Sequence, residues 1–328
     1  MRELVINSND AGQRADKFLS KALVGIPQSL LHKYFRKKCV KINGVHAKGT
    51  EMLRSGDTLT LYISDEFFPD NTEKAQTHSV LHTLSDDDIA YEDENIIILD
   101  KAQGEAVHSS LPDEESKDNE ICLVDRLIGY LITKGEYIPE NENSFTPALC
   151  NRLDRNTSGL VIAAKNAEAL RIMNEKIKNR ELSKKYLAAV HGTFEEKEGV
   201  LKGYLIKDSK TNTVKVFKTQ PKNGEAKKII TGYRVVAEKN GLSLLEVDLI
   251  TGRTHQIRAH MSSIGHPLLG DGKYGVNRDD KQIGYKYQAL YSYSLEFCFK
   301  GDSGILGYLN ERTFKINEDK IWFCREFK

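Results

Sequence analysis

The sequence predicts an α+β protein with two domains, the larger of which is built on a mixed, largely antiparallel sheet. Its 328 residues are 39% hydrophobic and 29% charged, and a chain of this length is at the upper limit for a single compact unit. Residues 65–78 are polar with little apolar content, which is typical of a linker. Beyond them, short strand-like runs alternate with a few helical segments. We therefore expect a small N-terminal domain over residues 1–64 and a large domain over residues 79–328.

The small domain should combine two helices with a short sheet. An amphipathic helix is expected over residues 16–24, and Gly25-Ile26-Pro27 should end it. A second helix is expected over residues 29–37. A hairpin around Asn43-Gly44 and a strand over residues 58–63 complete this α/β unit.

Basic residues gather in the same small domain. Between positions 14 and 48 there are nine lysine or arginine residues against one acid, Asp16, although the whole chain carries a net charge of only +1. Such an asymmetry indicates a polyanionic partner, and RNA is the expected one. A basic helical cap that only solubilises the chain is the alternative. The candidate RNA contacts are Arg14, Lys33, Arg36, Lys37 and Lys38.

The large domain should be rich in short strands. Strands are expected over residues 95–99, 159–164, 186–190, 228–236 and 242–249, and helices over residues 125–133, 167–179 and 256–264. The tail after Lys300 could add strands to the sheet or form an extension of its own. This order of elements predicts the mixed, largely antiparallel sheet.

Residues 151–160, NRLDRNTSGL, concentrate polar side chains just before one of these strands. Arg152 and Arg155 flank Asp154, while Thr157 and Ser158 supply hydroxyl groups. An opposite charge nearby favours the ionised form of a carboxylate, so Asp154 is a candidate nucleophile or anionic stabiliser. Taken alone, the same pattern would also fit a surface turn with an exposed ion pair.

Three later segments make the chain recognisable. They are KKYLAAVHG at residues 184–192, TGRTHQIRAHM at residues 251–261 and GHPLLGDGKYG at residues 265–275. Together with the Asp154 segment, they resemble the RluA family of RNA pseudouridine synthases. The resemblance covers roughly residues 88–299 and rests on several unrelated motifs that follow one another in the expected order.

The resemblance implies a role for three residues. Asp154 stands where the family has its essential aspartate, Tyr186 where a tyrosine packs on the target base, and Arg258 where an arginine pairs with the aspartate. Tyr186 could instead be a core aromatic, and Arg258 a phosphate contact. The chain departs from the family pattern at Asn151, usually a histidine, and at Ala102 in LDKAQGEAVH (residues 99–108), usually a proline.

A base inside stacked RNA must be flipped out before its bond to the sugar can be changed, which predicts a cleft lined with cations. The segment over residues 171–185, with Lys176, Lys178 and Arg180, is expected as one basic edge of it, unless it is a solvated helix face. The RNA contacts expected in the large domain are Arg152, Arg155, Lys184, Lys185, Arg253, His255 and Gln256.

The small domain carries a second resemblance. RADKFL at residues 14–19, the basic second helix, VKING at residues 40–44 and Gly56-Asp57 are similar to the S4 RNA-binding domain. Many RluA-type enzymes that act on ribosomal RNA have that domain in this place. The resemblance therefore implies that the N-terminal domain binds RNA.

The implied reaction needs no imported group. Pseudouridine forms when the bond from C1′ to N1 breaks, the uracil turns, C5 bonds to C1′, and C5 loses its proton; nothing is oxidised, so no cofactor is expected. Asp154 could add to the sugar or the base, or assist loss of the C2′ proton. The histidines His255, His260 and His266 are five and six residues apart without carboxylate or thiolate partners, so no metal is expected either.

The remaining composition places the protein among cytoplasmic enzymes. Its five cysteines lack close pairs, which disfavours disulfides and zinc, and it has neither a long apolar run nor a signal-peptide pattern at Met1. We expect a monomer that acts on bacterial large-subunit ribosomal RNA, with no membrane and no obligate protein partner. Transfer RNA is the alternative substrate, and a non-catalytic RNA-binding protein of ribosome assembly is the alternative function.

Overall fold

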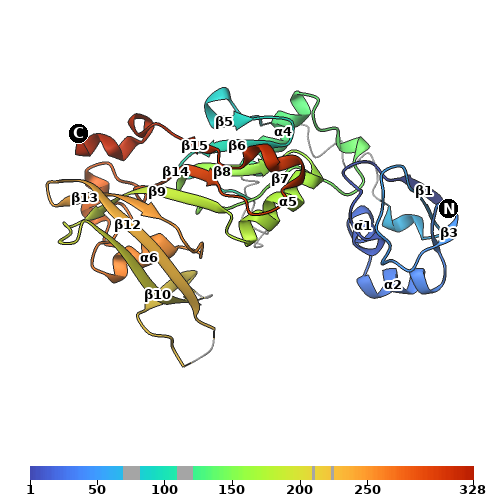
Figure 1. Cartoon of the computed structure of the whole chain (residues 1–328), viewed down its shortest axis with the longest axis horizontal. Helices are drawn as coiled ribbons and strands as arrows, with labels where there is room; N and C mark the ends of the chain where they lie inside the picture. Colours follow the sequence, from blue (N-terminus) through green and yellow to red (C-terminus); the bar gives the residue numbers. More distant parts are fainter. Residues whose placement is uncertain (69–81, 109–120, 209–210, 223–224) are drawn as a thin grey trace.

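The computed structural model describes residues 1–68, 82–108, 121–208, 211–222 and 225–328, so most of the expected linker, residues 69–78, lies outside the described residues. Within these ranges the chain forms a four-stranded sheet near the N-terminus and an eleven-stranded sheet over the rest. The N-terminal unit lies at one end of the long axis in Figure 1, and strands β10, β12 and β13 lie at the other.

The N-terminal unit packs two helices on a small antiparallel sheet of strand order β1-β4-β2-β3. Its elements are β1 Arg2–Val5, α1 Ala15–Ala22, α2 Gln28–Arg36, β2 Val40–Ile42, β3 Val45–His46 and β4 Thr58–Leu61. Both expected helices, the hairpin and the strand are confirmed, whereas β1 was not expected. Phe18, Leu19 and Phe35 help to form a core of the unit's own, and Phe67 and Phe68 pack against it, so the packing continues past residue 64.

The large sheet runs in the order β11-β10-β12-β13-β9-β14-β8-β6-β5, with β15 beside β14 and β7 beside β8. All its described pairs are antiparallel except β14 with β8, which confirms the expected sheet. The strands are β5 Ile89–Glu92, β6 Ile96–Lys101, β7 Ala148–Leu149, β8 Ser158–Ala164, β9 Leu182–His191, β10 Glu198–Asp208, β11 Thr213–Phe217, β12 Lys227–Lys239, β13 Leu242–Asp248, β14 Leu290–Phe297 and β15 Thr313–Lys315.

Both faces of the sheet are covered at its centre. Every residue of β8 is buried. Because side chains alternate along a strand, Val161 joins the core beneath helix α4 (Leu123–Thr133), whereas Leu160 and Ile162 join the core beneath α5 (Ala167–Lys178). The tail after Lys300, which could have added strands to the sheet, contributes the 3₁₀ turn η4 (Gly304–Leu309) to the second core and the short strand β15 to the sheet.

The same arrangement brings the polar segments together. The Asp154 segment enters β8, Tyr186 lies in β9 two strands away, and α6 (Gln256–Ser263) follows β13. The short helix α7 (Arg278–Gln282) follows the glycine-rich segment around Asp271. Asp154 therefore lies in the loop before β8, Tyr186 in the middle of β9, and Arg258 in the first turn of α6.

Candidate active site

The loop that carries Asp154 is held by its backbone. The carbonyl of Arg155 accepts hydrogen bonds from the Lys101 ammonium at 2.8 Å and from the Gly104 amide at 3.1 Å. Lys101 is 1% exposed and also donates to the carbonyls of Ala102 and Glu105, at 2.7 and 2.9 Å. Burial lowers the pKa of Lys101 to about 8. Nevertheless, these three carbonyl bonds make its amine a fixed support for the loop.

Asn151, which replaces the histidine usual in the resembling family, has a structural use. Its side-chain oxygen accepts the backbone N–H of Ile162 in β8, at 2.8 Å. A second bond closes the turn itself, because the amide of Thr157 donates to the carbonyl of Asp154 at 3.0 Å. The asparagine therefore fastens the start of the loop to the strand that follows it.

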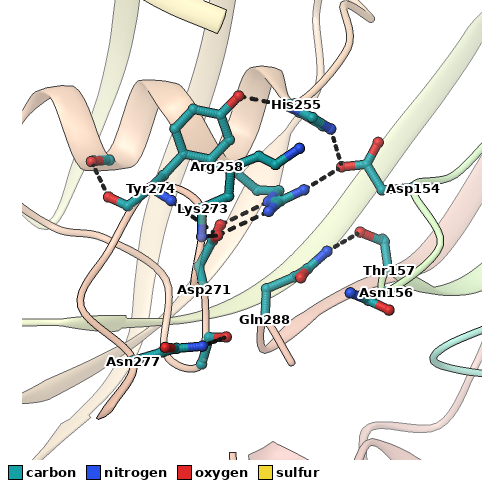
Figure 2. Close-up of polar contacts among 12 residues, drawn as sticks. Asp154, Asn156, Thr157, His255, Arg258, Asp271, Lys273, Tyr274, Asn277 and Gln288 are labelled. Carbon is teal, nitrogen blue, oxygen red and sulfur yellow. Dashed lines mark hydrogen bonds and ion pairs between the residues drawn. The ribbon is translucent and has the colours of Figure 1, made fainter. Parts of the chain in front are cut away.

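Two carboxylates share the guanidinium of Arg258 (Figure 2). Its Nη1 donates to Oδ2 of Asp154 at 2.9 Å, while Nε and Nη2 donate to the two oxygens of Asp271 at 2.7 and 2.9 Å. Asp271 is fully buried and also accepts the backbone N–H groups of Lys273 and Tyr274. Burial alone would lower the pKa of Arg258, but its bonds to Asp271 and the charge of Asp154 raise it, so the guanidinium stays charged.

His255 forms the second contact with the carboxylate of Asp154. Its Nε2 lies 3.7 Å from Oδ2 of Asp154, and its Nδ1 lies 2.8 Å from the hydroxyl of Tyr274. That hydroxyl accepts the backbone N–H of Val214 at 2.9 Å, so its own proton is left to donate to Nδ1. Burial lowers the pKa of His255. A neutral His255 therefore carries its proton on Nε2, on the side of Asp154.

These contacts leave one oxygen of Asp154 open. The Arg258 and His255 contacts both end on Oδ2, and among the described residues no group bonds Oδ1. The Asp154 side chain is 26% exposed, whereas that of Arg258 is 8% exposed. The carboxylate is thus anchored on one side and accessible on the other, which is the arrangement an attacking anion requires.

Asp154 lines a cleft of about 1210 Å³. This is larger than the roughly 300–1,000 Å³ of small-molecule sites, which favours a macromolecular substrate. Asp154 is the one acid among the described residues that line it. The nine basic lining residues are Arg152, Arg155, Lys178, Arg180, Lys184, Lys207, Arg253, Arg258 and Lys273. Such a surplus of cations fits a phosphate backbone.

Tyr186 lies at the inner wall of the cleft, where it is 5% exposed. Burial raises the pKa of its phenol to about 12, so the hydroxyl keeps its proton at neutral pH. A phenol in this state can pack its ring on a base, but it is poorly suited to remove a proton from C5.

The strand geometry separates the two lysines before Tyr186. Lys184 lines the cleft with Tyr186, whereas Lys185 between them bonds Glu246 at 3.4 Å and is not among the lining residues. Side chains two residues apart share a face of a strand, and their neighbour faces the other way. Lys185 is therefore misplaced as an RNA contact in this cleft. Burial lowers the pKa of Lys184 to about 8, and the thiol of Cys150 lies near it.

Two further expectations need correction. Gln256 lines the cleft but is only 2% exposed, and its amide is already bonded to Thr251 and to Ile230 and Thr231 of β12, so it braces α6. Lys176, expected on the basic edge, is 5% exposed and bonds Glu181 and the carbonyl of Lys300. Partners that sequence spacing did not reveal satisfy the hydrogen-bonding groups of Gln256 and balance the charge of Lys176.

The other expected contacts fall into two groups. Arg152, Arg155 and Arg253 are exposed and line the cleft, with His255 beside them. The N-terminal set lies in the other unit: Lys33, Arg36, Lys37 and Lys38 are exposed on or just after α2, and Arg14 is paired with Asp16 at 2.6 Å.

Sequence reasoning missed Lys101, Asp271 and Tyr274. Asp271 and Tyr274 lie in GDGKYG, a segment that carried the family resemblance but for which no individual role was predicted. An acid between two glycines, 13 residues after the helical arginine, was the available signal for Asp271. Lys101 gave none, because a lysine at the end of an apolar strand is usually solvated.

No three His, Cys, Asp or Glu side chains gather into a metal-binding group within the described ranges. In the same part of the chain, no helix has the length and apolar character needed to cross a bilayer.

The chain is similar to several known proteins. Residues 95–263 match the family model of RNA pseudouridylate synthases. The chain is 34% identical over 307 residues to an uncharacterized RNA pseudouridine synthase of Mycoplasma genitalium, covering 90% of this chain and 88% of that one. It is 29% identical over 309 residues to the ribosomal large subunit pseudouridine synthase C of Salmonella typhi, with 92% and 90% covered. The solved human RNA pseudouridylate synthase domain containing 1 shares the fold, with a TM-score of 0.52, 20% identity, and 75% of this chain and 96% of that chain covered.

Proposed function

The chain belongs to the family of RNA pseudouridylate synthases, and from that premise we propose that it modifies uridines of large-subunit ribosomal RNA with Asp154 as the nucleophile. The isomerisation of uridine to pseudouridine is the activity of the family. The observation that carries the rest is the anchored carboxylate: Arg258 and His255 hold Oδ2 of Asp154, and Oδ1 faces a cleft whose other charged walls are cationic.

The chemistry assigns a task to each anchored group. Oδ1 of Asp154 attacks C1′ of the flipped nucleotide, and the C1′–N1 bond breaks with its electron pair going to the uracil. The uracil turns, and C5 bonds to C1′ as the C1′–Oδ1 bond breaks and releases the carboxylate. A base or water then takes the proton from C5, and N1 gains a proton. Addition to the base or abstraction of the C2′ proton would use the same anion. Arg258 keeps that anion oriented throughout, because Asp271 holds the guanidinium independently of Asp154.

Tyr186 takes the part of a packing surface in this proposal. Its ring lines the cleft beside Asp154, and its raised pKa of about 12 supports stacking over proton abstraction. The cleft cations, among them Arg152 and Arg253, would hold the phosphates of the flipped nucleotide and its neighbours. The base leaves its stack most easily in loops and bulges, so these are the expected target structures.

The N-terminal unit would supply a second RNA contact. Its exposed cations on and after α2 and its similarity to the S4 domain support this role. Ribosomal RNA is favoured over transfer RNA because relatives aligned over nine-tenths of the chain are named for the ribosomal large subunit. Such a substrate would be met in the cytoplasm.

The test is pseudouridine formation in unmodified large-subunit RNA transcripts, without added cofactor or metal, by the wild-type protein and by Asp154→Ala and Asp154→Asn. We expect product from the wild type alone and RNA affinity within about twofold in all three, since the carboxylate repels phosphates and does not bind them. Arg278→Ala, at an exposed position of α7 outside the cleft lining, is the control and should retain activity.

Each other outcome excludes part of the proposal. Product from Asp154→Ala would rule out this nucleophile. Product on transfer RNA transcripts alone would show that the protein is a pseudouridine synthase with transfer RNA as its substrate. Absence of product on both RNAs, with RNA binding intact, would favour a non-catalytic assembly protein.

A further inference from the structure

A buried carboxylate joins the N-terminal unit to the large unit. Asp10, in the turn between β1 and α1, is fully buried. Its Oδ2 accepts the side-chain amide of Asn143 at 2.7 Å, and its Oδ1 accepts the hydroxyl of Ser144 at 2.7 Å. Both donors belong to the large unit, more than 130 positions along the chain. A buried carboxylate without such donors would be strongly unfavourable, so the pairing selects one arrangement of the two units.

Neighbouring contacts extend this junction to helix α5. Asn9 donates to Glu142 at 2.7 Å, and its side-chain oxygen accepts the backbone N–H of Ala167 at 3.0 Å. Ala167 is the first residue of α5, so a side chain of the N-terminal unit satisfies one of the unpaired amides at the start of a helix of the large unit. One turn later, Arg171 donates to the carbonyl of Ala11 at 2.9 Å.

The contacts of the junction are directional. Each of those given above is a hydrogen bond to a side chain or to a helix terminus, and the N-terminal unit keeps a hydrophobic core of its own. Polar groups satisfied in only one geometry fix orientation more strictly than an apolar contact of the same size, which tolerates sliding.

Helix α5 links this junction to the cleft. The junction lies at its first turn, whereas Lys178 at its last position and Arg180 just beyond line the cleft. Its twelve residues span roughly 18 Å at the usual helical rise. In Figure 1, α5 lies between the N-terminal unit and the far strands of the large sheet. The helix is therefore a rigid spacer between the docked unit and the edge of the active site.

We propose that the Asp10 junction holds the N-terminal RNA contact at a fixed distance from Asp154, so that the enzyme selects uridines lying at a matching distance from a second feature of the RNA. The inference rests on the proposed function for its RNA part. Its structural part, a fixed arrangement of the two units, does not depend on any activity.

The perturbation is Asn143→Asp, with Asp10→Asn as its rescue. Asn143→Asp sets two carboxylates 2.7 Å apart in a buried site, which should open the junction. Adding Asp10→Asn exchanges the amide and the carboxylate and restores the pair. Because the double variant has the same composition as the wild type, its recovery separates lost docking from failed folding.

The first readout is the distance between spin labels at Val45 and Glu195, one exposed position in each unit, measured by pulsed electron paramagnetic resonance without RNA. The cysteines that are not buried, Cys39, Cys150 and Cys298, are first replaced by serine. We expect one narrow distribution for the wild type and the double variant and a broad one for Asn143→Asp. A broad distribution in the wild type, or a narrow one in Asn143→Asp, overturns the inference whatever the activity.

The second readout separates KM from kcat. On long RNA, Asn143→Asp should raise KM by about tenfold or more, because a fixed second contact raises the effective concentration of the target by such factors. The kcat should stay within about twofold, and a short stem-loop with only the target uridine should be modified equally well by all three proteins. Unchanged KM and site choice on long RNA would refute the positioning role. Absence of pseudouridine from every protein would instead refute the proposed function and leave the distance result standing.

Discussion

Replacing Asp271 by Asn should cost the protein more stability than activity, whereas replacing Asp154 by Asn should do the reverse. Both carboxylates bind the guanidinium of Arg258, but Asp271 is fully buried and makes two bonds to it, while Asp154 is partly exposed and makes one. Both variants replace a carboxylate that binds Arg258 by an amide. A difference between their effects on stability and activity therefore reflects how deeply each carboxylate is buried and what each one does.

The expected magnitudes follow from what each change leaves behind. Asp271→Asn leaves Arg258 buried without its main counter-charge and turns an amide toward its N–H groups, which should cost about 3–5 kcal/mol of unfolding free energy. Asp154→Asn leaves the buried Arg258–Asp271 pair neutral and intact, so it should cost no more than about 1 kcal/mol. Catalysis should vanish in Asp154→Asn. It should fall by about 100-fold in Asp271→Asn, because a displacement near 1 Å of an oriented group costs a factor of this size.

The chain contains a natural fluorescent probe for measuring the expected change in stability. Trp322 is its single tryptophan, packed among the core residues of the large unit, so fluorescence during urea unfolding reports that unit. Single-turnover pseudouridine formation at saturating enzyme measures the chemical step. The reasoning would be refuted if Asp154→Asn destabilised the unit as much as Asp271→Asn, or if Asp271→Asn unfolded at the wild-type urea concentration.

Three further outcomes are expected. Burial lowers the pKa of Lys184 to about 8, so its positive charge is present below that pH and lost above it. We therefore expect kcat/KM to fall between pH 7 and 9. Lys184→Arg, which keeps its charge over this range, should remove the fall. Burial also lowers the pKa of His260 to about 4 from an unfolded value of 6.5, so stability is complete above pH 6.5 and decreases by on the order of 3 kcal/mol as the pH falls to 4. Urea unfolding of His260→Gln should show a flatter dependence, and an unchanged slope would contradict the assignment. Lys101→Met removes the hydrogen bond to the Arg155 carbonyl and should lower kcat about tenfold or more without changing RNA affinity. Full activity in single-turnover assays would show that the Asp154 loop keeps its conformation without Lys101.

Local sequence patterns predicted the elements whose environment is simple. The amphipathic helices α1 and α2 end within two residues of the expected positions, because one face of each packs on a core and the other meets water. Strand β14 was missed although its alternating tyrosines and serines have the period of a strand; both of its faces are buried, so the alternation does not separate a core face from an exposed one. Strand β10 was missed because it lies near the edge of the sheet, where Gly199 and Gly203 interrupt its apolar pattern.

The residues of the site were likewise predicted only in part. The motifs that carried the resemblance predicted Asp154, Tyr186 and Arg258, and the fold places all three around one cleft. Lys185 belongs to the same motifs but lies outside the cleft lining, where it bonds Glu246 on the neighbouring strand. Gln256 lies in the lining but is buried, and its amide is bonded to β12. A motif therefore predicts which segment forms the site, while the direction of each side chain depends on long-range contacts such as Lys185 with Glu246.

The electrostatics of the cleft explain why a second carboxylate is needed. Nine cations line the cleft around Asp154, but a full positive charge bound to this carboxylate alone would stabilise its resting state and weaken the attack that we propose for it. Asp271 takes two of the three hydrogen bonds from Arg258 to the carboxylates and balances its charge, so the guanidinium orients Asp154 while neutralising it only in part. The remaining negative charge is on the side that faces the cleft, where the sugar of a flipped uridine would develop positive charge as the bond to N1 breaks. If Asp154 acts as we propose, this arrangement would favour the transition state over the resting enzyme, which an isolated arginine–aspartate pair would not do.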